Sequence, residues 1–92
     1  MFVFSCSAET KVDCEDLKQG ERAPFMVYIN YADLFGAEQL CQMYLMREGF
    51  TNIEMEKRKY IQAATVEKLK FKEKDVQVAV KEGYFLRMFE GE

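Results

Sequence analysis

The segment from Phe25 to Tyr31 constrains the fold most, because it has the two-residue period of a strand and is apolar on both sides. One side carries Phe25, Val27, Ile29 and Tyr31, and the other carries Met26, Tyr28 and Asn30. A strand with two apolar faces needs cover on both of them, which is typical of the interior of a sheet. We therefore expect this segment to be a central strand.

Three other segments have the same period and are interpreted as strands: Phe2 to Ala8, Asn52 to Gln62, and Tyr84 to Glu90. In the second of them, Ile53 and Met55 alternate with glutamates before a run of three cations. Alternating charge of this kind discourages pairing with other chains and therefore favours an edge strand. A break into two short strands near Lys57 is the alternative.

The clearest helix is expected from Asp33 to Glu48, with Asp33 as its N-cap and Gly49 as its C-terminal stop. The stripe that should pack on the sheet consists of Ala37, Leu40, Cys41, Tyr44 and Leu45. Residues 63–70 are ambiguous, with a helical turn as one interpretation. A short helix should follow, with Asp75 as its N-cap and Gly83 as its stop.

The order of these elements predicts one α+β domain over residues 1–92. We expect a two-layer sandwich with a single, mostly antiparallel sheet of about four strands and two or three helices on one face. The ferredoxin-like plait is the nearest common arrangement, although the leading strand pair does not match it cleanly. The strand–helix–strand unit around the main helix should cross over right-handed if its strands are parallel neighbours.

The chain has no histidine, which removes the residue best suited to proton transfer near neutral pH and the commonest metal ligand. We find no phosphate-binding glycine loop and no metal-ligand spacing, so we expect no catalytic residues, no cofactor and no metal. The chemical alternative is a thiol enzyme centred on Cys6, activated without a histidine. Three widely spaced cysteines, Cys6, Cys14 and Cys41, indicate reduced thiols, and with no targeting or membrane segment we expect a cytoplasmic protein with no membrane partner.

The side of the main helix away from the sheet carries the first candidate interaction residues: Gln39, Gln42, Met43 and Met46. A solvated helix surface normally carries lysines and glutamates, whereas methionine is enriched in interfaces. This pattern favours a surface that binds another protein. The alternative is that Met43 and Met46 pack under a loop or under Phe50.

The final strand gives the second set of candidate interaction residues: Phe85, Arg87 and Phe89. Large apolar groups stand on both of its faces, so the face away from the helices needs a cover. That cover is either the polar loop from Thr10 to Ala23 or a second copy of the chain. Complete burial within the monomer is the alternative.

Two charged segments have weaker interpretations. Lysines and one arginine between Lys57 and Lys74, with Tyr60 and Phe71 available for stacking, are compatible with a nucleic-acid-binding module. The net charge of −3 opposes long-range attraction to phosphate, so we do not expect nucleic acid as the main partner. The acidic 9–21 loop, with Asp13, Glu15 and Asp16, would hold a calcium ion, face a basic partner, or remain solvated.

Taken together, these patterns predict a small, acidic, non-catalytic protein-interaction domain. It would act as a homodimer or by neutralising a partner protein. The alternative from a different class is the nucleic-acid-binding module of residues 57–74.

Overall fold

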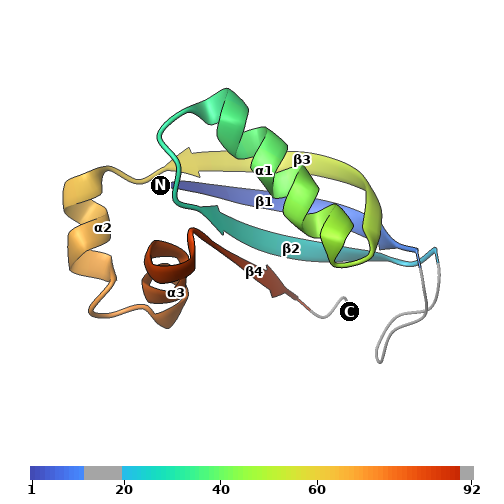
Figure 1. Ribbon diagram of the computed structural model, residues 1–92. Helices are drawn as coiled ribbons and strands as arrows, with labels where there is room; N and C mark the ends of the chain where they lie inside the picture. The colour runs from blue at the N-terminus through green and yellow to red at the C-terminus, as the bar shows by residue number, and fades with distance from the viewer. Residues whose placement is uncertain (12–19, 90–92) are drawn as a thin grey trace.

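The computed structural model describes residues 1–11 and 20–89, and two long antiparallel strands form its centre (Figure 1). β1 (Phe2–Thr10) pairs with β2 (Arg22–Ile29) along nearly their whole length. Every second residue of β1 is buried, as expected for a strand with one fully covered face.

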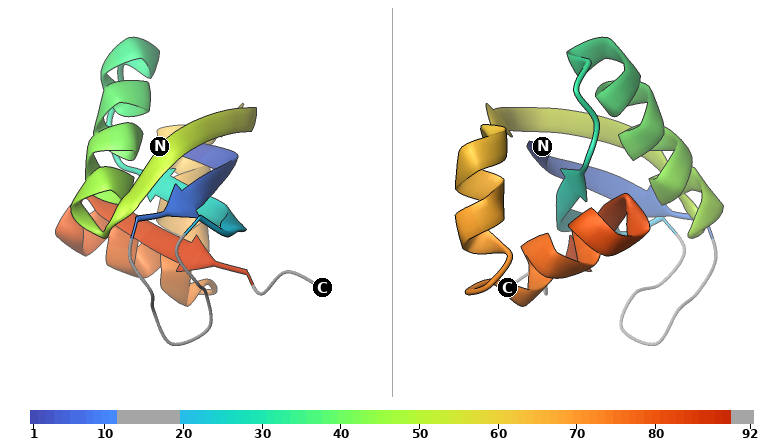
Figure 2. Two further views of the ribbon diagram at one scale, coloured as in Figure 1. Left: turned by 90° about the vertical axis from the view of Figure 1, so that its right-hand side faces the viewer. Right: turned by 60° about the vertical axis from the view of Figure 1, so that its left-hand side comes forward.

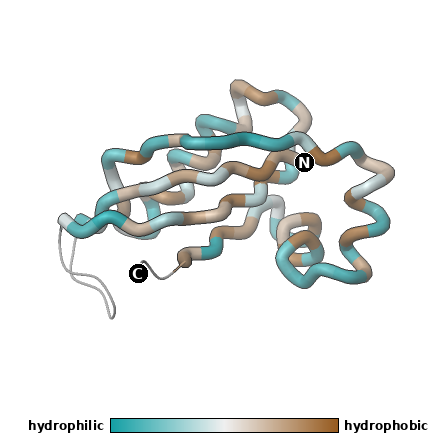
Figure 3. The backbone as a smooth tube through the Cα atoms, turned by 180° about the vertical axis from the view of Figure 1, so that it is seen from behind, coloured by the Kyte–Doolittle hydropathy of each residue, from teal (hydrophilic) through white to brown (hydrophobic). Residues whose placement is uncertain are grey.

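The two outer strands complete a sheet with the order β3-β1-β2-β4. β3 (Phe50–Tyr60) pairs with β1 and β4 (Tyr84–Met88) pairs with β2, and all three pairings are antiparallel. The predicted α+β fold with one antiparallel sheet of four strands is confirmed, as are the central position of the second strand and the edge position of the third. Figure 3 shows that β3 is mostly hydrophilic, which fits its place at the edge.

The main helix, α1 (Leu34–Arg47), connects two parallel strands that are not neighbours. It leads from β2 to β3, and both of these strands run antiparallel to β1, which lies between them. The ferredoxin-like plait has two units of this split kind. This chain has one, because β1 and β2 follow each other directly while α2 (Ala63–Leu69) and α3 (Lys74–Glu82) lead from β3 to β4.

The larger part of the core lies between α1 and the sheet. Phe4, Cys6 and Val27 from the central strands are fully buried there. They pack against the inner face of α1, whose Ala37, Cys41 and Leu45 are equally inaccessible. The ring of Tyr44 stacks on Tyr84 of β4 with 3.8 Å between the ring centroids, which ties α1 to an edge strand as well.

The other two helices cover the opposite face at one end of the sheet. Tyr28 and Phe85 alternate with core residues along their strands, so their side chains point away from α1. They join a second cluster around Val66 of α2 and Val76 and Ala79 of α3. The helices thus lie on both faces rather than one, because the apolar side chains on the back of the sheet also need cover. Figure 2 shows α2 and α3 gathered at one end of the strands.

The helix ends agree with the predictions at three points, one of them the end of α3 at Gly83, and differ at one. The Asp33 carboxylate caps α1 by accepting a 2.8 Å hydrogen bond from the Gly36 amide, and Gly49 follows the helix with a φ of +97°. The expected N-cap of α3 is wrong: Glu73 occupies that position and Asp75 lies inside the first turn. The carboxylate of Asp75 binds Arg87 of β4 and is therefore not free to cap the helix.

Cys14 lies outside the described residues. So do Asp13, Glu15 and Asp16, the acidic residues for which a calcium ion or a basic partner was considered. Within residues 1–11 and 20–89, none of the helices is long and apolar enough to cross a membrane.

Candidate interaction surface

The four helix residues expected to contact a partner lie together on the outer side of α1. Gln39, Gln42, Met43 and Met46 are all exposed, and the two methionines keep 45% and 52% of their surface accessible to solvent. Within the described part of the chain, no loop covers them, and Phe50 is instead buried against Phe25 on the sheet side. The fully buried residues on the inner face of α1 fix the rotation of the helix on the sheet, and this rotation directs the four residues away from the sheet.

Phe35 belongs to the same surface and was missed by the sequence analysis. Its side chain is 69% exposed at the start of α1. Positions 35, 39, 42 and 46 have the i, i+4, i+7 and i+11 spacing of a single helical stripe. This spacing could have identified Phe35 from the sequence, because extending the stripe by one turn towards the N-terminus includes it. We call the five side chains Phe35, Gln39, Gln42, Met43 and Met46 the outer face of α1.

No charged side chain interrupts the outer face. Glu38, at one flank, forms an ion pair with Arg58 of β3, with 3.1 Å between the carboxylate and guanidinium. Arg47, at the other flank, has no carboxylate within ion-pair distance among residues 1–11 and 20–89. A shallow groove of about 550 Å³ lies along the outer face from Gln39 to Met46, and Arg47 and Lys11, the residue after β1, also line it. The surface is therefore neutral in the middle and cationic at one border.

The three candidate residues of the final strand do not join this surface. Phe85 is half-buried, lies 6.3 Å from Tyr28 between ring centroids, and packs in the second cluster with α3. Arg87 donates hydrogen bonds to Asp75 of α3, one of them at 2.8 Å. Phe89 remains 42% exposed beyond the end of β4. Phe85 and Arg87 thus connect β4 to α3 within the monomer. The face of β4 that was expected to be covered by a loop or by a second copy is partly covered by α3.

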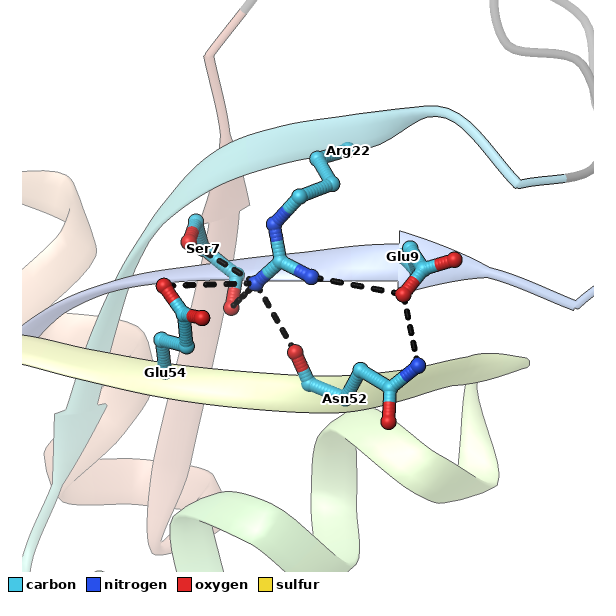
Figure 4. A network of polar contacts seen from close by, with 5 residues as sticks. All are labelled: Ser7, Glu9, Arg22, Asn52 and Glu54. Carbon is cyan, nitrogen blue, oxygen red and sulfur yellow. Dashed lines mark hydrogen bonds and ion pairs between the residues drawn. The ribbon is translucent and has the colours of Figure 1, made fainter.

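A polar network on the back of the sheet was not anticipated from the sequence (Figure 4). Arg22 of β2 donates to the Ser7 carbonyl and hydroxyl at 3.1 and 3.0 Å and to the Asn52 carbonyl at 2.8 Å. The Glu9 carboxylate lies 3.4 Å from Arg22 and accepts a 2.6 Å hydrogen bond from the Asn52 amide. The guanidinium therefore joins β2, β1 and β3. Its two terminal nitrogens bind groups of the neighbouring strands, so we interpret the network as structural.

The basic residues between Lys57 and Lys74 do not form one continuous stripe. Arg58 points towards α1, where Glu38 binds it, whereas its neighbours on β3 point to the other face. The later lysines surround the turn between α2 and α3, which lies apart from β3 in Figures 1 and 2. Phe71 projects from this turn with 83% of its surface exposed, and the ammonium of Lys70 lies 5.5 Å from its ring centroid.

The described cysteines are both buried in the core. Cys6 of β1 and Cys41 of α1 are free thiols with no exposed surface. A hydrogen bond with Cys6, together with burial, raises the pKa of the Cys41 thiol. Among residues 1–11 and 20–89, no group of three potential ligands is placed to hold a metal ion.

Comparison of the chain with protein families, curated proteins and solved structures gives no match.

Proposed function

We propose that this chain is a small, non-catalytic protein-interaction domain and that the outer face of α1 is its contact surface. The observation that carries the proposal is the composition of α1, which is apolar on both sides. Its inner side is buried, yet Phe35, Met43 and Met46 stand in solvent on the other side. A helix with apolar groups all round is normally covered all round, and methionine and phenylalanine are enriched where proteins meet.

The residues between the apolar groups support the same proposal. Gln39 and Gln42 separate Phe35 from Met46 without introducing a charge. Covering a glutamine costs far less than covering a lysine or glutamate, because only hydrogen bonds and no net charge must be desolvated. As part of the proposal we place the protein in the cytoplasm, which the two free, buried thiols support.

Site-directed photo-crosslinking tests this proposal. A benzophenone amino acid introduced in place of Gln42 should form adducts with a protein partner in the native source, and Met46→Lys should suppress them. The matched control places the same reagent at Phe71, which is even more exposed but lies away from α1. Adducts from position 42 that are missing from position 71 support the proposal. No protein adduct from position 42, or the same adducts from both positions, would contradict it.

A second candidate function, binding of single-stranded nucleic acid, rests on the turn between α2 and α3. Phe71 offers an exposed ring for base stacking, and Lys70 and Lys72 flank it in sequence. Fluorescence anisotropy with a labelled oligonucleotide at low salt tests it. Binding by the unmodified chain that Phe71→Ser removes would support this function, and an unchanged anisotropy would exclude it.

A further inference from the structure

The outer face of α1 has a symmetrical pattern along the helix. From the N-terminal end, the stripe consists of Phe35, Gln39, Gln42 and Met46. Its two ends are therefore apolar and its two middle positions are amides. The two apolar residues are equally distant from the middle of the stripe, and so are the two glutamines. In a two-fold contact residue i of one copy meets residue j of the other and residue j meets residue i, so a stripe with this pattern would bring apolar groups opposite apolar groups and amides opposite amides.

We infer that the partner of this face is a second copy of the chain, packed through an antiparallel pair of α1 helices. The inference rests on the proposed function, because it assigns an occupant to the same surface. In the antiparallel register, Phe35 lies opposite Met46 of the second copy, and Gln39 lies opposite Gln42 of the second copy. Phenylalanine and methionine make favourable sulfur–aromatic contacts, and two facing amides can both donate and accept hydrogen bonds.

The dipoles of the two helices agree with the antiparallel arrangement, because the positive N-terminal end of each α1 then lies beside the negative C-terminal end of the other.

The size of the surface sets the expected strength of the dimer. If each of the five outer-face side chains covers about 100 Å², the pair buries about 1,000 Å² in total, which is near the lower limit of specific interfaces. We therefore expect a reversible dimer with a dissociation constant in the micromolar range. A contact of this kind dissociates on dilution, so the concentration must be varied in any test.

Charge substitutions at the two glutamines test the partner and the register together, with sedimentation equilibrium from about 1 to about 500 µM as the readout. In the antiparallel register, the double variant Gln39→Glu/Gln42→Lys forms two ion pairs between subunits. Its dimer should be about fivefold tighter than wild type at low salt, and salt should remove the gain. The matched variant Gln39→Lys/Gln42→Lys brings like charges together and should weaken the dimer at least about tenfold.

A parallel pairing predicts the opposite, because each position would then face its own copy. Glutamate would meet glutamate in the first variant, so weakening by both variants would overturn the register. A wild-type chain that stays monomeric at the highest concentration would overturn the dimer itself. A monomeric chain would not by itself contradict the proposed function, because crosslinked adducts from position 42 to a different protein would still support it. Circular dichroism of each variant confirms that α1 remains helical.

Discussion

Two adjacent residues of α1 should respond very differently to the same substitution. Leu45 has no exposed surface and packs between α1 and the sheet, whereas Met46 is 52% exposed on the outer face. Leu45→Ala leaves a cavity in the core and should lower the free energy of unfolding by about 3 kcal/mol. Met46→Ala removes a side chain that has about half of its surface in solvent and should lower the free energy of unfolding by less than about 0.5 kcal/mol.

Urea unfolding measures this contrast at a protein concentration of about 1 µM, where a weak dimer is dissociated. With a slope of about 1 kcal/mol per molar urea, Leu45→Ala should move the midpoint down by about 3 M. Met46→Ala should leave the midpoint almost unchanged at this concentration, and it should remove any rise in the wild-type midpoint as the protein is concentrated. A loss of about 2 kcal/mol or more for Met46→Ala in the monomer would refute the reasoning, because it would mean that Met46 belongs to the core.

Three further predictions concern the cap, the polar network and the buried thiols. Asp33→Ala removes the α1 cap and should cost about 1 kcal/mol of stability in urea unfolding, with Asp33→Asn restoring most of it. Arg22→Ala should cost about 1 to 2 kcal/mol and Arg22→Lys nearly as much, because a lysine cannot reproduce the forked contacts; equal stability of all three chains would show that the network contributes nothing. In a Cys14→Ser chain, a thiol reagent should find no reactive thiol until denaturant is added. Because the pKa of Cys41 is raised in the folded state, unfolding above the ordinary thiol pKa releases a proton, so the stability of this chain should fall as the pH rises beyond about 9.

The fold could be predicted largely from local patterns, because each central element carries an unambiguous period. The two-sided apolar segment of β2 requires cover on both faces, and the structure places α1 on one and α3 on the other. The sequence could not assign α2 and α3 to the back of the sheet, since that choice depends on contacts distant in sequence. Val76 and Ala79 indicate the apolar side of an amphipathic helix. An apolar side alone does not determine which face of the sheet the helix packs against.

The candidate site shows the same limit in another form. The helical period identified the outer face of α1, because a neutral surface where charges are usual is visible in the sequence itself. The final strand carried no such signal for Arg87, whose partner Asp75 is on α3. The network around Arg22 depends on carbonyl groups of β1 and β3, which the sequence does not display. Contacts that use the backbone or a distant element therefore escape a reading of the residues alone.

The packing of α1 explains why its outer face points to an interaction rather than to stability. A helix on one sheet contacts it along a single stripe, and the buried stripe of α1 is already complete with Ala37, Cys41 and Leu45. Phe35 and Met46 keep 69% and 52% of their surface exposed, and exposed apolar groups make a chain more prone to associate. Lysine or glutamate at these positions would keep the same helix and improve solubility. Residues 1–11 and 20–89 leave the apolar side chains on this side exposed, and this exposure supports the proposal that a second protein surface covers them.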